Sequence, residues 1–138
     1  MSKKLITLFC IIVMMVGVTH AADLVNDPKV RTIDGYIVSV KSAIETGRNT
    51  GYAESIGDRT VFSRSVSSTF YYLDTHNNVV GSTNKNMNIP KGTPIDCRVS
   101  YTTSYSYQLI YKVSSSHNIT DPTPLDPISW TPNTECIY

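Results

Sequence analysis

The fifteen residues from Val99 to Val113 carry the pattern that most constrains the fold of this chain. Hydrophobic and aromatic side chains occupy nearly all the odd positions, and hydroxyl-bearing or otherwise polar side chains occupy most of the even ones. Successive side chains on a strand point to opposite sides, so this alternation predicts one aromatic face and one polar face exposed to solvent. A helix could not gather the odd positions on one side. The pattern therefore predicts an all-β protein.

The same stretch supplies a candidate binding surface. As one strand it would be nearly 50 Å long at about 3.3 Å per residue, whereas strands usually hold about five or six residues, so we expect a bend or turn at 102–104. For any one tyrosine, cross-strand packing is the simpler interpretation. A tyrosine that stays exposed offers a partner an apolar ring with a polar tip. With the single tryptophan, the candidate surface comprises Tyr101, Tyr105, Tyr107, Tyr111 and Trp130.

The first 21 residues are typical of a secretory signal peptide. Lys3 and Lys4 precede an apolar run from Leu5 to Val18, and small residues follow near Ala21. The run is short for a bilayer span, which needs about 20 apolar residues. We expect cleavage after Ala21, one mature domain over 22–138, a periplasmic or secreted location, and no membrane insertion after cleavage.

Cleavage would also change the charge and the cysteine count. The mature chain would have ten Lys and Arg (twelve minus Lys3 and Lys4) and eleven Asp and Glu. This charge balance does not favour nucleic acid as a partner. Cys10 would leave with the signal peptide. The two remaining cysteines would reach an oxidising compartment, where disulfides persist. The sequence therefore predicts a Cys97–Cys136 disulfide that anchors the tail, residues 117–138.

Residues 28–46 fit two structures. Apolar residues at three-four spacing, with Pro28 near the start and Gly47 at the end, would suit one helix, which would make the fold α+β. Asp34-Gly35 between two β-prone runs is a strong hairpin signal. Lys29 would also be unfavourable near the positive end of a helix dipole. We favour the hairpin and keep the helix as the alternative.

The rest of the chain fits a small antiparallel β-sandwich or partly open barrel. The glycine-rich segment 46–58 is predicted to be a surface loop. A second hairpin is expected around the turn-forming residues 74–78. Prolines at 122, 124, 127 and 132 exclude helix, so the C-terminal tail should run extended over the surface.

No motif in the chain indicates catalysis, a metal site or a cofactor. The mature chain would have two histidines, His76 and His117, each among polar residues typical of turns, and they lack the spacing of a metal-binding pair. No Gly-x-Ser-x-Gly motif is present. We therefore predict no catalytic residues, no metal ligands and no cofactor.

These observations favour an exported, non-enzymatic binding module. Its partner would be a protein, as for a periplasmic inhibitor, an immunity protein or a subunit of a surface assembly. The alternative is a glycan-binding, adhesin-like domain that uses the tyrosine and tryptophan surface. The sequence itself names neither a reaction nor a ligand.

Overall fold

The computed structural model describes residues 23–57, 61–121 and 127–138, so the predicted signal peptide lies outside the described residues. The described residues form strands, turns and loops, with no helix among them. The strands are β1 (Leu24–Ile33), β2 (Tyr36–Ile44), β3 (Thr50–Ile56), β4 (Ser63–Leu73), β5 (Val79–Ile89), β6 (Cys97–Thr102), β7 (Leu109–Asp121), β8 (Ile128–Trp130) and β9 (Asn133–Ile137).

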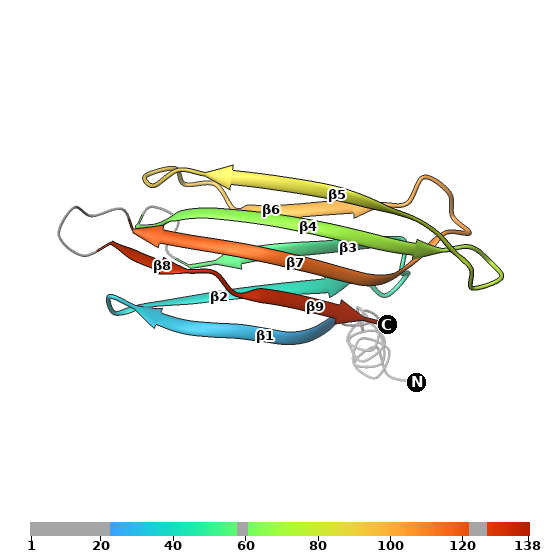
Figure 1. Ribbon diagram of the computed structural model, residues 1–138, viewed down its shortest axis with the longest axis horizontal. Coiled ribbons are helices and arrows are strands. Elements are labelled where there is room, and N and C mark those ends of the chain that lie inside the picture. The colour runs from blue at the N-terminus through green and yellow to red at the C-terminus, as the bar shows by residue number, and fades with distance from the viewer. Residues whose placement is uncertain (1–22, 58–60, 122–126) are drawn as a thin grey trace, which may run out of the picture.

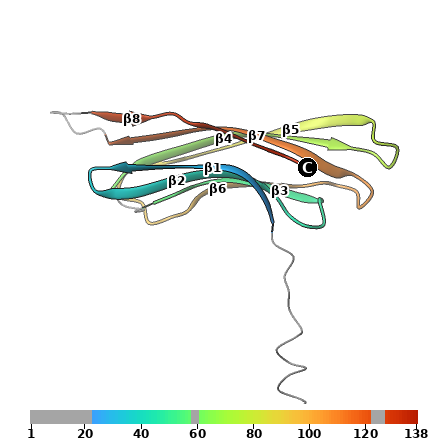
Figure 2. The ribbon, with the colours of Figure 1, turned by 90° about the horizontal axis from the view of Figure 1, so that it is seen from below.

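The strands form two antiparallel sheets that pack face to face. Sheet A has the order β1-β2-β3-β6, and sheet B has the order β5-β4-β7-β8, with β9 also paired to β7. Figure 2 shows the two layers edge-on, and Figure 1 shows the strands running along the long axis of the molecule. The sheets do not close into a barrel. The predicted all-β class is confirmed, and the architecture is that of a small β-sandwich.

The first hairpin confirms one of the two interpretations of residues 28–46. β1 and β2 pair antiparallel, with Ile33 opposite Tyr36. Asp34 and Gly35 form the turn between them with φ of 50° and 82°. Two successive positive φ values match the twist of a tight hairpin, and Asp-Gly tolerates them well. The alternative of a single helix over this segment is wrong.

The glycine-rich segment after this hairpin is not the predicted surface loop. Residues Thr50–Ile56 form β3, an inner strand of sheet A that pairs with both β2 and β6. Gly51 lies where the sheets approach closely: a Cβ at this position would come 2.8 Å from Cγ2 of Val113. The glycine that suggested a loop thus makes room for a core side chain.

The second predicted hairpin is present and longer than its sequence pattern suggested. β4 and β5 pair from Arg64 opposite Ile89 to Leu73 opposite Val79. The Asp74 carboxylate accepts hydrogen bonds from the backbone N–H groups of His76 (2.8 Å) and Asn78 (3.0 Å). These bonds lower the pKa of Asp74, as expected where hydrogen bonds favour the charged form.

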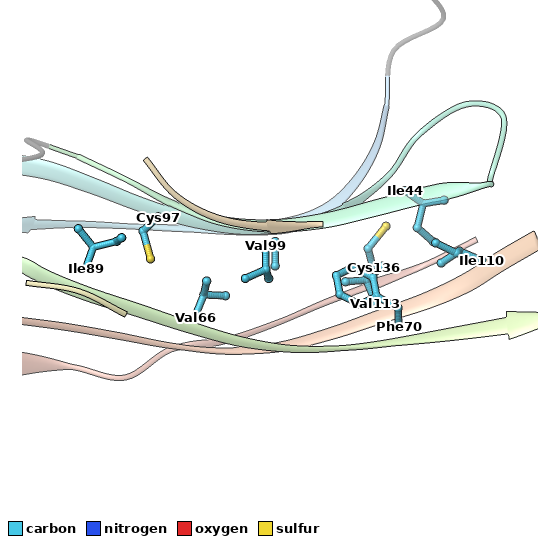
Figure 3. Packing of buried hydrophobic residues seen from close by; sticks show 10 residues of the cluster. Ile44, Val66, Phe70, Ile89, Cys97, Val99, Ile110, Val113 and Cys136 are labelled. Atoms are coloured by element: carbon cyan, nitrogen blue, oxygen red, sulfur yellow. The ribbon is translucent and has the colours of Figure 1, made fainter. Parts of the chain in front are cut away.

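The inner faces of the sheets bury two apolar clusters. The first contains residues from both sheets, among them Ile44, Val66, Phe70, Val99 and Val113 (Figure 3). The second lies towards the other end of β2 and β7. Its buried members are Ile33, Val38, Val40, Phe62 and Ile119.

The predicted Cys97–Cys136 disulfide is not formed in the structure. Both residues are buried thiols of the first cluster, and Figure 3 shows them separated along it. The Cys136 thiol donates a hydrogen bond to the Leu24 carbonyl oxygen at 3.2 Å. Burial raises the pKa of Cys97, so its thiol is a weak nucleophile.

The C-terminal segment is extended, as predicted, but strand pairing holds it instead of a disulfide. β8 pairs with the end of β7, with Trp130 opposite Ile119. β9 pairs with the preceding part of the same strand, with Cys136 opposite Val113. A proline lacks the N–H that a ladder needs. Pro132 lies between the two short strands and inside neither.

Candidate functional site

The tyrosine-rich stretch breaks near its predicted bend, and its two halves enter different sheets. β6 belongs to sheet A and ends at Thr102, whereas β7 begins at Leu109 in sheet B. The loop 103–108 joins them at one end of the sandwich (Figure 1). The prediction that Tyr101, Tyr105, Tyr107 and Tyr111 share one strand face is therefore wrong, because the stretch is not one strand.

Two of the predicted surface residues pack against the core, far from each other. Tyr101 lies 5.9 Å from Phe70 and 5.8 Å from Tyr72, measured between ring centroids, beside the first apolar cluster. Trp130 packs against the second cluster and pairs with Ile119. Trp130 is therefore not on one surface with the tyrosines, because β8 lies at the far end of β7 from the loop 103–108.

Tyr105 and Tyr107 form an exposed stacked pair in the loop 103–108. Their ring centroids are 5.2 Å apart and the ring planes differ by 13°. Tyr105 is 55% exposed and Tyr107 is 50% exposed, so the pair contributes little to the core. Aromatic surface that the fold leaves uncovered is available to a partner.

Hydrogen bonds hold this loop against the turn between β2 and β3. The Asn49 side-chain amide nitrogen lies 3.2 Å from the Ser106 carbonyl oxygen and 3.0 Å from that of Gln108, and donates to both. The Thr103 backbone N–H donates to the Asn49 carbonyl oxygen at 2.8 Å. The Ile110 backbone N–H donates to the Arg48 carbonyl oxygen at 2.6 Å. The backbone that carries the stacked pair is thus tied to the rest of the molecule.

Further aromatic rings lie at the same end. The Arg48 guanidinium carbon lies 3.9 Å from the Tyr138 ring centroid, and the Tyr138 backbone N–H donates to the Tyr111 carbonyl oxygen. Tyr111 contacts Tyr71 at 6.2 Å between ring centroids. We call this surface the aromatic end. It comprises Tyr71, Tyr105, Tyr107, Tyr111 and Tyr138, with Arg48 and Lys112.

The sequence predicted three members of the aromatic end and missed the others. Tyr105, Tyr107 and Tyr111 were on the candidate surface, whereas Tyr71, Tyr138 and Arg48 were not. Tyr71 is on β4 and Tyr138 follows β9, so only tertiary structure brings them to Tyr111. Lys112 lies over the Tyr71 ring, and its hydrogen bond to Glu135 (2.7 Å) raises the pKa of Lys112.

A buried polar network crosses the sandwich between the two apolar clusters. His117 Nδ1 lies 3.0 Å from Ser55 Oγ, and His117 Nε2 lies 2.9 Å from Thr134 Oγ1. Ser42 Oγ continues the chain at 2.6 Å from Thr134 Oγ1 and 2.8 Å from Ser115 Oγ. Ser68 Oγ ends it at 2.8 Å from Ser115 Oγ. All six side chains are buried.

One proton order satisfies this network. Ser42 donates to Ser115, so Thr134 must donate to Ser42, and its oxygen then accepts from His117 Nε2–H. His117 Nδ1 then accepts from the Ser55 hydroxyl. This order requires a neutral imidazole, which carries one N–H and one acceptor nitrogen. Burial accordingly lowers the pKa of His117 to about 4.

The two histidines have different environments, although both were predicted to lie in turns. His76 is exposed in the turn between β4 and β5. His117 is on β7 with its side chain 1% exposed, so its turn prediction is wrong. The adjacent Ser55 hydroxyl is also buried between the sheets. The contacts of His117 therefore join the two sheets.

Neither a metal-binding cluster nor a membrane-spanning helix is found in the described part of the chain. Within 23–57, 61–121 and 127–138, no group of three or more His, Cys, Asp or Glu is arranged to hold a metal ion. The same residues include no helix with the length and apolar character of a membrane span. Comparison of the chain with known family models and with curated proteins finds no match.

Proposed function

We propose that this chain is an exported, non-enzymatic binding module that engages a protein partner through the aromatic end. The observation that carries the proposal is the Tyr105–Tyr107 pair, stacked and more than half exposed on average, on a loop held by hydrogen bonds. A periplasmic inhibitor, an immunity protein and a subunit of a surface assembly are all protein-binding modules of this kind, acting in the periplasm or outside the cell.

The composition of the aromatic end favours a protein as its partner. Tyrosine and arginine are enriched where proteins bind each other and often carry most of the binding energy. The loop 103–108 alternates tyrosine with serine, a composition also common in the binding loops of antibodies. Tyrosine offers a large contact area for the loss of few rotatable bonds.

The rigidity of the loop supports the same proposal. Ordering a flexible loop on binding costs free energy that would be subtracted from affinity. Here Asn49 already bonds the loop backbone at Ser106 and Gln108. The Thr103 hydroxyl adds a bond to the Gln108 carbonyl oxygen at 3.0 Å. Binding a partner would therefore require little further ordering of the loop that carries the Tyr105–Tyr107 pair.

Site-specific photocrosslinking in the native host tests this proposal. A benzophenone side chain at position 105 should capture a discrete protein partner, whereas the same group at Ile37, exposed beside the opposite turn, should not. The purified partner should then bind the Tyr105→Ala, Tyr107→Ala double variant at least about tenfold more weakly than the parent, the loss expected for a hot spot. Tyr36→Ala, at the far end, is the matched tyrosine control.

Two results would overturn the proposal. One is the absence of any position-105 adduct in host cells that express the protein. The other is equal affinity of the captured partner for the parent and for a double variant with an unchanged unfolding midpoint. Either would mean that the aromatic end is not where a protein binds.

A further inference from the structure

The outer face of sheet B carries two adjoining hollows that the aromatic end does not include. The larger, of about 610 Å³, lies over β4, β7 and β9. The smaller, of about 450 Å³, lies over β4, β5 and β7. Ser67 lines both, so the two hollows adjoin at this residue.

Strand register aligns four polar side chains across the two hollows. Asn133 is opposite Ser116, Ser116 is opposite Ser67, and Ser67 is opposite Asn86. All four are exposed, because their neighbours along each strand point inwards. Three strand spacings of about 4.8 Å make this row roughly 14 Å long. We call it the polar row.

The chemistry around the polar row is uncharged over most of its length. The smaller hollow is lined by Ser65, Val66, Ser67, Asn86, Met87, Asn88 and Asn118, with no charged side chain among them. The larger has two charged residues in its lining, Lys29 and Glu135, and Glu135 is paired with Lys112. The outer face of sheet A differs, since Lys41 and Arg98 both pair there with Glu54.

We infer that the polar row binds a neutral oligosaccharide. Hydroxyl and amide groups both donate and accept hydrogen bonds, as sugar hydroxyls do. A nucleic acid would require clustered cations. Serine and asparagine are also short, so holding them in place on binding costs little rotamer entropy. The length of the row suits a short chain of sugars better than a single ring.

Tyr71, next to the row, would give the sugar chain an apolar contact at one side. Tyr71 follows Thr69 on the same face of β4, and Thr69 lines the larger hollow. The Thr69 hydroxyl donates to Asn84 Oδ1 at 2.6 Å, which holds β4 and β5 in register beside the row. A pyranose ring has a face of C–H groups that can pack on a tyrosine ring, while its hydroxyls bond to serine and asparagine.

NMR titration of the folded protein with neutral hexasaccharides tests this inference. Cello-, malto-, xylo-, manno- and chitohexaose are the probes, with hexamers of polygalacturonate as the charged comparison. At least one neutral hexamer should give saturable shifts at amides of residues 65–69, 84–88 and 114–118. The Ser67→Ala, Asn86→Ala double variant should weaken that binding about tenfold, the loss expected for two hydrogen bonds.

Two control variants separate this inference from the proposed protein-binding function. Ser100→Ala, on the exposed face of β6 in sheet A, should leave sugar affinity unchanged. Tyr105→Ala with Tyr107→Ala should also leave it unchanged, even where that variant loses its protein partner. No shift with any neutral probe, binding restricted to the charged hexamer, or equal affinity of the Ser67 and Asn86 double variant would each overturn the inference.

Discussion

Among single residues, His117 makes contacts that no local pattern indicates. Its imidazole connects Ser55 of sheet A to Thr134 of sheet B, and burial holds its pKa at about 4. A buried network in which every polar group is hydrogen-bonded stabilises the fold by more than the sum of its separate bonds. A buried polar group that loses its partner destabilises the fold. His117 should therefore hold the sheets in one relative position as long as it stays neutral.

The stability of the fold should fall as the pH drops from about 6.5 to about 4. The pKa of His117 is lower in the folded than in the unfolded chain, so the unfolded chain binds the proton first. The contribution of His117 is complete above about pH 6.5, and about 3 kcal/mol is lost by about pH 4. Urea denaturation across this range measures the effect.

Carboxylates also titrate in this pH range, and the parent and His117→Gln share them. The difference between the unfolding free energies of these two proteins therefore isolates the contribution of His117. His76→Gln, at an exposed histidine outside the buried network, is the control substitution. NMR titration should give His117 a pKa near 4. A His117 pKa near 6.5, or equal slopes in the parent and His117→Gln, would contradict the assignment.

At the scale of elements, the edges of the two sheets are protected in different ways. β1 has a register shift between Asn26 and Lys29, with Pro28 inside it. Proline and bulges both interrupt the ladder that another strand would extend. β5 is long and exposed, and it carries Lys85 opposite the inward-facing Ser68. A charge on the inner side of an edge strand opposes pairing with a second molecule.

Replacing Lys85 by valine should expose β5 to association. Valine suits strands and removes the only charge on β5, so a second chain could pair along this edge. Sedimentation velocity over a concentration series should show a mean mass that rises for Lys85→Val, while the Lys85→Arg control behaves as the parent. Identical behaviour of Lys85→Val and the parent would show that other features protect this edge.

At the scale of the whole molecule, register keeps the two buried thiols apart. Phe70 is opposite Val113, which is opposite Cys136, so Cys136 lies at the level of Phe70. In Figure 3, Cys97 lies next to Ile89, and Val66 lies between Cys97 and the group that contains Cys136. Val66 and Phe70 are four residues apart on β4, about 13 Å along the strand. A disulfide requires Cα atoms within about 7 Å.

Peptide mapping of the folded protein without reductant should therefore contain no peptide pair linked through Cys97 and Cys136. Alkylation should also modify Cys97 far more slowly in the folded protein than in urea, because Cys97 is buried. Protein unfolded and then oxidised provides the positive control for the linked pair. A linked pair in the folded sample would mean that β6 and β9 are placed differently.

The alternation from Val99 to Val113 and the Asp34-Gly35 turn were enough to predict strands, an all-β class and the first hairpin. Both signals are local, because side-chain alternation and positive φ are properties of neighbouring residues. The sequence likewise predicted Tyr105, Tyr107 and Tyr111 as surface candidates.

Only tertiary structure decided which strands pair and which side chains the sheets bury. The chain turns from sheet A into sheet B after Thr102, which separates Tyr101 from the aromatic end. Strand order places β3, which contains Gly51, inside sheet A and brings Tyr138 beside Arg48. The sequence around His117 is typical of a turn, and only the hydrogen bonds of its side chain with Ser55 and Thr134 reveal its position between the sheets. These outcomes depend on partners distant in sequence, and short-range patterns carry no information about distant partners.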